Sequence, residues 1–287
     1  MALSESFFDR THTGPTPVAV ANKRRGAEIA VQDISHSYGR GDAVLDGIDF
    51  AIEPGSVVAL LGRSGCGKST LLHILAGLTR PSSGNVEISG ARVRGPSPKW
   101  VMMFQAPSLY PWMSVAETAA LGLRFGGRIQ DANQRVPRIL DLVELTEFAD
   151  RNVQDLSGGQ QQRAALARSL ATDPDVLLLD EPFSALDIFT RQALQRDVRA
   201  IARRMGMTVV LISHDVSEAV TMADRVIVMA SGPGRISEDV TLDLSEADRN
   251  DPASDALTHE ISRVSRAYGA IAANLNLSSP HNSGTFP

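Results

Sequence analysis

A glycine-rich turn at residues 62–70, with the sequence GRSGCGKST, has the composition and spacing needed to hold a chain of phosphates. It matches the pattern G-x-x-x-x-G-K-[ST] and stands between a strand-like apolar run and a helix-like run, as that pattern requires. The glycines let backbone N–H groups surround an anion, and the start of the helix adds partial positive charge. Lys68 can reach the outer phosphates, and the Ser69 hydroxyl can bind Mg²⁺. The predicted phosphate-binding residues are Gly62, Arg63, Ser64, Gly65, Cys66, Gly67, Lys68, Ser69 and Thr70.

Two later segments end in side chains that suit phosphate chemistry. DVLLLDEP at residues 175–182 is an apolar run that ends in Asp180 and Glu181. Ligands bind at the carboxyl edge of an open parallel sheet, so Asp180 is expected to orient Mg²⁺ and Glu181 to polarise the attacking water. Such a carboxylate pair alone is usually structural, and the phosphate loop strengthens its functional interpretation. His214 ends the next apolar run, where we expect it to contact the γ-phosphate.

A second glycine corner, LSGGQ at residues 156–160, precedes a helix-prone run. Ser157 suits a helix N-cap, and the N–H groups of such a corner can also hold an anion. The two interpretations are compatible. One chain therefore carries a complete phosphate loop and a second potential anion-binding turn.

The elements that must position these residues alternate between strand and helix. Alternating apolar strands and helices predict a parallel sheet that is buried on both faces. Residues 114–150 depart from this alternation: they show helical spacing with no strand, which indicates a helical insertion. Predicted strands cover 28–38, 43–52, 56–62, 85–90, 100–104, 175–180, 207–213, 224–230 and 235–244, and predicted helices cover 68–76, 159–171, 190–205, 216–222 and 253–268.

Length and composition limit the possible functions. The 287 residues suffice for a large core, and the net charge of -5 disfavours a nucleic-acid partner. Cys66 is the only cysteine, which excludes an intrachain disulfide and favours a reducing compartment; we interpret it as a small loop-filling residue without chemistry. No run is long and apolar enough to span a bilayer, and the N-terminus does not resemble a secretory signal. We expect a flexible leader at 1–27 and a disordered tail at 271–287.

Together these motifs resemble the nucleotide-binding subunit of an ATP-binding cassette (ABC) transporter over residues 28–240. The resemblance implies a P-loop NTPase of the ABC-ATPase fold: an α/β protein with a mostly parallel core sheet, an N-terminal antiparallel β subdomain and an inserted α-helical subdomain at about residues 106–157. It leaves residues 241–270 as a short C-terminal extension with one helix. ATP is then hydrolysed to ADP and phosphate with Mg²⁺.

The same resemblance assigns further roles. Gln105 matches the glutamine that binds Mg²⁺ and connects its site to the helical insertion, so the implied metal ligands are Ser69, Gln105 and Asp180. We also include Gln105 among the catalytic residues with Lys68, Glu181 and His214. Tyr38 stands where the family has an aromatic that stacks on adenine, although on the sequence alone it can also be an ordinary strand aromatic. The remaining nucleotide-contacting residues implied by the family are Ser157, Gly158, Gly159, Gln160 and Asp187.

In this family two copies pack head to tail, and the LSGGQ corner of each closes on the ATP held by the phosphate loop of the other. The resemblance therefore implies a homodimer in which Ser157, Gly158 and Gly159 reach the γ-phosphate in trans. It also implies two transmembrane permease subunits, an extracytoplasmic solute-binding protein as an indirect partner, and a peripheral location at the cytoplasmic face of the inner membrane.

A narrower resemblance concerns residues 103–123, MFQAPSLYPWMSVAETAALGL, and the run Pro233–Ile236. Both are similar to importers of nitrate, sulfonates, taurine and related small anions. On the sequence alone, Trp112 can also belong to the core of the helical insertion. Three alternatives stay open: a non-transport ABC ATPase acting on DNA or ribosomes, an ABC exporter subunit, and a small-molecule P-loop kinase. The kinase leaves the LSGGQ corner and His214 unexplained.

Overall fold

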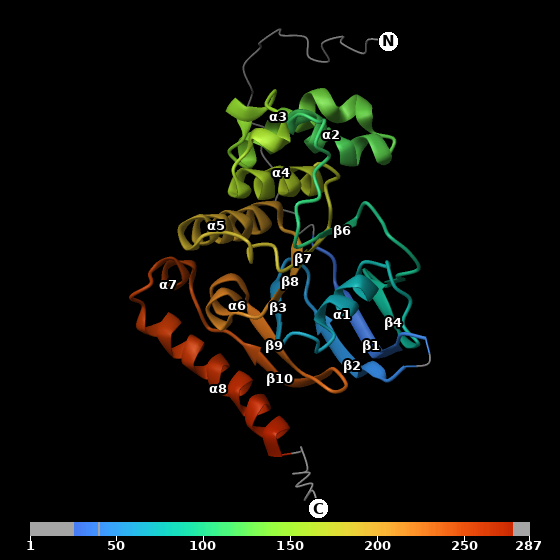
Figure 1. The fold of residues 1–287 in the computed structure, drawn as a ribbon, viewed down its shortest axis with the longest axis vertical. Helices are drawn as coiled ribbons and strands as arrows, with labels where there is room; N and C mark the ends of the chain where they lie inside the picture. Colours follow the sequence, from blue (N-terminus) through green and yellow to red (C-terminus); the bar gives the residue numbers. More distant parts are fainter. Residues whose placement is uncertain (1–25, 40, 278–287) are drawn as a thin grey trace, which may run out of the picture.

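The computed structural model describes residues 26–39 and 41–277, with the side chains of 271–277 excepted. Two sheets and a separate helical layer make up the fold (Figure 1). The predicted leader, except for its last two residues, and the tail from residue 278 lie outside the described part. Within that part, no helix is both long and apolar enough to cross a membrane.

The larger sheet has the predicted parallel arrangement. Its order is β10-β9-β3-β8-β7-β6, and only β10 runs antiparallel to its neighbour. Successive side chains of a strand point to opposite faces, so the all-apolar strands feed two cores. The strands are β3 (Val57–Gly62), β6 (Trp100–Met103), β7 (Val176–Asp180), β8 (Thr208–Ser213), β9 (Arg225–Ala230) and β10 (Arg235–Thr241).

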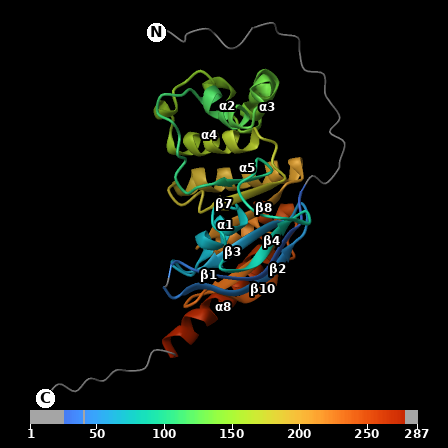
Figure 2. The ribbon, with the colours of Figure 1, turned by 90° about the vertical axis from the view of Figure 1, so that its right-hand side faces the viewer.

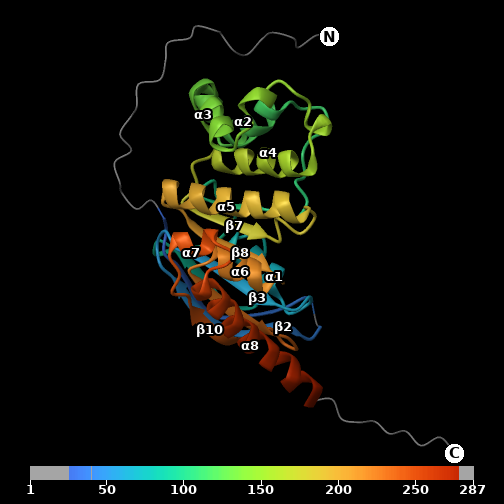
Figure 3. The ribbon, with the colours of Figure 1, turned by 90° about the vertical axis from the view of Figure 1, so that its left-hand side faces the viewer.

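Each face of this sheet is covered by a different layer. The face carrying Val57, Ala59 and Leu61 packs against α5 (Ile188–Met205), α6 (Val216–Met222) and α8 (Asp255–Leu277) (Figure 3). The face carrying Val58 and Leu60 packs against α1 (Lys68–Leu75) and the smaller sheet (Figure 2). That sheet is antiparallel, with the order β2-β1-β4-β5 and the bounds β1 (Ile29–Ser37), β2 (Ala43–Ile52), β4 (Ser83–Ile88) and β5 (Ala91–Arg92).

The helical insertion forms the layer at the top of Figure 1. It contains α2 (Val115–Phe125), α3 (Ala132–Leu142) and short 3-10 turns, and it packs on α4 (Gly158–Leu170). Ser114 begins α2 with a reciprocal capping box to Glu117. The absence of strands predicted for residues 114–150 is confirmed: apart from an isolated β-bridge of Ser114 to Asn152, that segment consists of helices, turns and irregular connections.

The C-terminal extension contains two helices where the sequence analysis predicts one. The additional helix is α7 (Glu246–Asn250), whose capping box joins Ser245 and Asp248. The second, α8, continues to Leu277 instead of ending near residue 268. A five-residue helix is too short to show a periodic apolar pattern, so α7 depends on its cap and on ion pairs.

A buried arginine joins this extension to the core. Arg199 on α5 is 5% exposed, and its guanidinium donates to the Glu246 carboxylate at 2.7–3.1 Å, to Asp224 at 2.9 Å and to the Met222 carbonyl at 2.5 Å. The Arg199 hydrogen bond lowers the pKa of Glu246. This contribution to stability is therefore present above the ordinary carboxyl pKa and is lost as pH falls through the lowered folded-state value.

Replacing Arg199 by alanine is expected to lower the free energy of unfolding by about 3 kcal/mol, because it removes the buried cation that joins Asp224 and Glu246 and leaves these carboxylates to the half-exposed Arg203 and to Arg249. Chemical denaturation at neutral pH measures the change. Arg204→Ala on the same helix, where the side chain is exposed, is the control and should change stability by less than about 0.5 kcal/mol. Equal effects of the two substitutions would contradict the assigned role of Arg199.

Candidate functional site

The phosphate loop connects β3 to α1 and has the backbone that its glycines predict. Gly65 and Gly67 have φ values of +80° and +93°, in the left-handed region that favours glycine. A Cβ on Gly67 would lie 2.6 Å from Leu45 Cδ2, so only glycine fits there. Gly67 begins α1 without a side-chain cap, which leaves the helix N-terminus free to receive an anion.

Lys68 is a buried ammonium group inside this loop. Its side chain is 5% exposed, and its Nζ donates to the carbonyl oxygens of Gly62 at 2.7 Å and Arg63 at 3.0 Å. No carboxylate forms an ion pair with Lys68 among the residues that the structure describes. Burial of a charge without an opposite charge is costly, so the loop is preorganised for an anionic ligand.

Ser69 and Asp180 meet at the carboxyl edge of the parallel sheet. The Ser69 hydroxyl donates to Asp180 Oδ1 at 3.1 Å. Burial raises the pKa of Asp180, and the Ser69 hydrogen bond opposes that rise. A hydroxyl oxygen beside a partly desolvated carboxylate fits Mg²⁺, which takes few protein ligands and completes its shell with phosphate and water oxygens.

Glu181 and His214 lie side by side at the ends of β7 and β8. His214 Nδ1 is 3.2 Å from Glu181 Oε2. Glu181 also has a backbone φ of +44°, in the left-handed region that a residue with a Cβ seldom adopts. Such strain concentrates at functional sites, and the two carboxylates of the pair contact different partners, Ser69 for Asp180 and His214 for Glu181.

Gln105 is connected to the same group through Ser184. The Gln105 Nε2 donates to Ser184 Oγ at 3.0 Å, and Ser184 Oγ donates to the carbonyl oxygen of Glu181 at 3.0 Å. Of the predicted catalytic residues, Gln105, Glu181 and His214 follow the ends of β6, β7 and β8, and Lys68 begins α1 after the loop that follows β3. All four therefore lie at the carboxyl edge of the sheet.

Tyr38 lies at the end of β1, above the start of α1. Its side chain is 56% exposed, and its hydroxyl is 3.2 Å from Thr70 Oγ1, so either oxygen can donate. The ring of His36 packs edge-on against it, with centroids 4.6 Å apart. An exposed aromatic held beside the phosphate loop suits stacking on a nucleotide base better than a core role.

Cys66 is buried at 1% exposure. Burial raises the pKa of its thiol, and the nearby Lys68 only partly opposes the rise. A buried thiol with a raised pKa is a poor nucleophile, which supports its interpretation as a loop-filling residue.

The LSGGQ corner does not join this group within one chain. Ser157 caps α4 through a reciprocal box: its N–H donates to Gln160 Oε1 at 2.9 Å, and its hydroxyl accepts from Gln160 N at 3.3 Å. Ser157 and Gly158 are exposed, whereas a Cβ on Gly159 would lie 2.4 Å from Thr190 Cγ2. Figure 1 shows α4 in the helical layer, apart from α1. The predicted N-cap role of Ser157 is confirmed.

Asp187 directly precedes α5 and serves as its N-cap. It caps α5 by accepting from the backbone N–H groups of Phe189 at 3.1 Å and Thr190 at 3.0 Å. Hydrogen bonds from Thr190 lower its pKa. The carboxylate is therefore ionised at neutral pH, and it accepts hydrogen bonds from the first turn of α5.

Sequence reasoning missed two polar residues that support the site. Gln162 is 2% exposed and contacts the backbone at Gln105 and Pro182. Glu218 accepts from Gln195 at 3.0 Å and from Ser213, the residue before His214. For both Gln162 and Glu218, the only indication in the sequence was a polar residue on the inward-facing side of a predicted helix.

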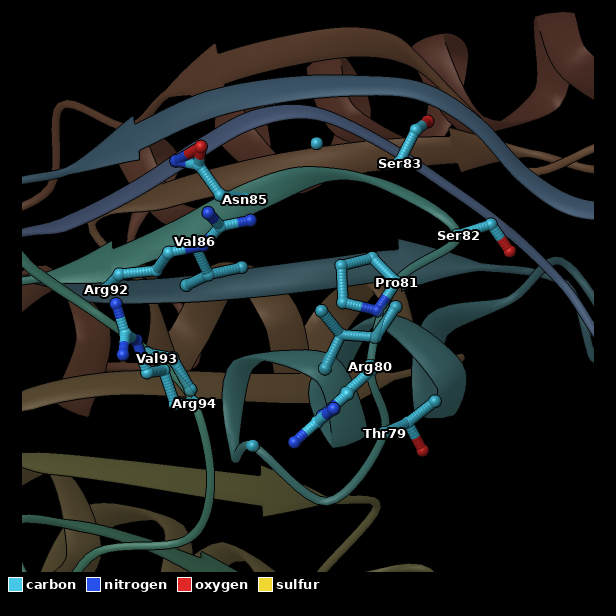
Figure 4. Close-up of a pocket in the computed structure, with 13 residues that line it drawn as sticks. Thr79, Arg80, Pro81, Ser82, Ser83, Asn85, Val86, Arg92, Val93 and Arg94 are labelled. Atoms are coloured by element: carbon cyan, nitrogen blue, oxygen red, sulfur yellow. The ribbon is translucent and has the colours of Figure 1, made fainter.

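A pocket of about 550 Å³ lies elsewhere, between the end of α1 and strands β4 and β5 (Figure 4). Arg80, Arg92 and Arg94 line it together with Pro81 and Val86, and none of the predicted site residues does. This pocket is therefore separate from the candidate site.

Comparisons with known proteins agree with the motifs and the fold. A family model described as "ABC transporter" matches residues 45–184. The taurine import ATP-binding protein of Jannaschia sp. is 42% identical over 223 residues, which cover 76% of this chain and 83% of that protein. An aliphatic sulfonates import ATP-binding protein of Mesorhizobium japonicum is 44% identical over 239 residues, 83% and 88% of the two chains. A spermidine/putrescine import ATP-binding protein of Thermobifida fusca is 42% identical over 231 residues, 78% of this chain and 60% of that protein.

A solved structure has the same fold. It is a dimeric ATP-binding cassette in a post-hydrolysis state, bound to ADP and Pi, with a TM-score of 0.66 and 29% identity over 76% of this chain and 100% of that one. The predicted α/β fold of the ABC-ATPase type is thereby confirmed. The chain belongs to the ABC transporter family, as one of its ATP-hydrolysing subunits.

Proposed function

We propose that this chain energises the import of a small anionic solute of the sulfonate type, of which taurine is an example. The observation that carries the proposal is the 42–44% identity to taurine and aliphatic sulfonate import proteins across most of both chains. The relative that imports polyamines is similar over less of its own length, and it makes an organic cation the alternative solute.

Hydrolysis would take place at the edge of the sheet where the predicted residues meet. Lys68 is placed to neutralise charge on the phosphates, since its ammonium group is buried and its partners, two carbonyl oxygens and the Cys66 sulfur, carry no formal negative charge in the neutral thiol form. Ser69, Asp180 and Gln105 would hold Mg²⁺, and the ion would supply positive charge that offsets the charge of the phosphates. Glu181 would then accept a proton from the attacking water, and His214 would hold the carboxylate in place and contact the γ-phosphate.

We further propose that two copies form the complete site head to tail. The support is the exposed Ser157 corner, which presents a helix N-terminus without an anionic partner among residues 26–39 and 41–277, and the dimeric form of the solved relative. Ser157, Gly158 and Gly159 would donate to the γ-phosphate of the ATP bound to the other copy. ATP would therefore favour the closed dimer, and loss of phosphate would favour its opening.

The transmembrane partners would be two permease subunits that dock on the helical layer at the cytoplasmic face of the inner membrane. An exposed aromatic pair supports this surface: Tyr110 is 41% and Trp112 is 71% exposed, and their rings lie 5.2 Å apart. The exposure of Trp112 excludes the alternative that it belongs to the core of the insertion. An extracytoplasmic solute-binding protein would deliver the solute to the permeases.

Uptake measurements test the solute class. Cells lacking this chain should lose uptake of labelled taurine and alkanesulfonates, while uptake of spermidine should be unchanged. The wild-type gene should restore uptake, and Glu181→Gln should not restore it. Loss of spermidine uptake with normal sulfonate uptake would contradict the proposed solute and favour a cation.

A further inference from the structure

Gln162 is a buried polar residue in the first half of α4. It is 2% exposed, and its neighbours Ala164, Ala165 and Leu166 belong to the main apolar core. Its Nε2 donates to two backbone carbonyls of other segments, that of Gln105 at 3.2 Å and that of Pro182 at 2.5 Å. Two carbonyl acceptors can only be satisfied by the NH₂ end of the side chain, which fixes its orientation.

The other end of this carboxamide is unsatisfied. Gln162 Oε1 is buried and has no hydrogen-bond partner among the described residues. An orphaned buried acceptor costs about 1–3 kcal/mol, a cost that the two hydrogen bonds made by Nε2 must offset. The two bonds made by Nε2 are therefore the reason for a glutamine here.

Both carbonyls lie in or next to the hydrolytic group, which is the set of predicted catalytic residues Lys68, Gln105, Glu181 and His214. Gln105 reaches Glu181 through Ser184 by two bonds of 3.0 Å, and Pro182 follows Glu181 directly in the chain. A shift of Gln162 would therefore displace Gln105 and the strained backbone of Glu181 together, because one side chain holds both segments.

The same helix begins at the LSGGQ corner. Ser157 caps α4, and Gln162 follows five positions later, about 7.5 Å along the axis. The side chain of Gln161, the adjacent residue, donates to the carbonyl oxygens of Val153 and Leu156, both within the segment that leads into α4. Within this stretch, Gln162 is thus the side chain that leaves the helical layer and contacts the hydrolytic group.

We propose that Gln162 is a positioning residue that couples the two ATP sites of the dimer. This inference rests on the proposed head-to-tail dimer. ATP bound to the other copy contacts the Ser157 corner and shifts the start of α4. Because the helix moves as a rigid unit, Gln162 moves with it and displaces Gln105 and Glu181 of its own chain. Engagement of one site then sets the catalytic geometry of the other.

Gln162→Met tests the coupling, because methionine keeps the length and volume but has no donor. The rate of ATP hydrolysis by the purified full chain is measured against ATP concentration. We expect the maximal rate to fall at least about fivefold, within the range of typical coupling energies, and the Hill coefficient to fall from above 1 to about 1. Gln161→Met is the matched control and should retain both values. A wild-type Hill coefficient in Gln162→Met, or a value of 1 in the wild type, would overturn the proposal.

Dimer formation separates this inference from the proposed function. In a Glu181→Gln background, Gln162→Met should still dimerise with ATP, since the Ser157 corner and Lys68 are intact. If neither the Glu181→Gln chain nor the Glu181→Gln chain that also carries Gln162→Met formed dimers with ATP, this would contradict the proposed dimer itself. If Gln162→Met does not fold, Gln162→Glu replaces it: a protonated carboxyl can donate one of the two bonds, so hydrolysis should recover as pH falls. A pH profile identical to that of the wild type would overturn the proposal.

Discussion

Replacing Glu181 by glutamine is expected to reduce ATP hydrolysis by about 10²- to 10⁴-fold, the usual contribution of a general base. Glutamine has the same shape but cannot accept a proton from water. ATP binding should be preserved, because Lys68, Ser69 and the glycines of the loop are unchanged. The variant should therefore accumulate as an ATP-bound dimer, which size-exclusion chromatography with and without ATP detects alongside a phosphate-release assay.

Glu147→Gln is the control for this prediction. Glu147 is exposed in the helical layer, where a neutral side chain should leave the hydrolysis rate unchanged. A Glu181→Gln chain that hydrolyses ATP at the wild-type rate would remove the assigned role of this carboxylate, whatever its state of assembly.

Replacing Lys68 by methionine should weaken ATP binding by about 2–5 kcal/mol, the cost of removing one partner of a desolvated charge pair. The reason is that Lys68 forms no ion pair with a carboxylate in the described part of the chain, and the Gly62 and Arg63 carbonyls hold its ammonium group in place. Without ATP, the melting temperature should stay the same or rise, because an unpaired buried charge is removed. Calorimetric titration with Mg²⁺-ATP and thermal unfolding measure the two effects.

Lys99→Met is the matched control, since Lys99 is exposed and pairs with Asp175 at 3.5 Å. It should bind ATP as the wild type does. Wild-type affinity in Lys68→Met, or a large loss of stability in the absence of ATP, would contradict the interpretation of Lys68 as a preorganised phosphate ligand.

The order of strands and helices could be predicted from the sequence because its signals are local. The runs at 57–61 and 176–179 are entirely apolar and strand-sized, and the structure places both in the interior of the parallel sheet. The phosphate loop could be predicted for the same reason: its glycines, lysine and serine lie within nine consecutive positions.

The connections between motifs could not be predicted, because they join positions far apart in the chain. The hydrogen bond of Gln105 to Ser184 spans 79 positions, and that of Gln162 to Gln105 spans 57. In both pairs, the sequence around one residue contains no pattern that indicates which distant residue it will contact. The helix α7 was also missed, because its stability comes from Ser245 and from the Arg199 pair rather than from an apolar stripe.

The relation between the two glycine turns is the central claim of the proposed mechanism. Within one chain the Ser157 corner lies in the helical layer, while the phosphate loop lies beside the antiparallel sheet. We expect the two turns to meet only when a second copy is present, so that each ATP is held by residues of both chains.

Mixing two defective chains tests this arrangement most directly. Lys68→Met lacks the phosphate ligand but keeps the corner, and Ser157→Arg blocks the corner but keeps the phosphate loop. Both are made in the Glu181→Gln background, and neither alone should form an ATP-bound dimer. The trans arrangement predicts that the mixture forms a dimer retaining a single labelled ATP, because one site then has an intact loop from one chain and an intact corner from the other. If the mixture retains no more ATP than the separate chains, or if Ser157→Arg alone retains ATP in full, the two turns do not share a nucleotide across the dimer.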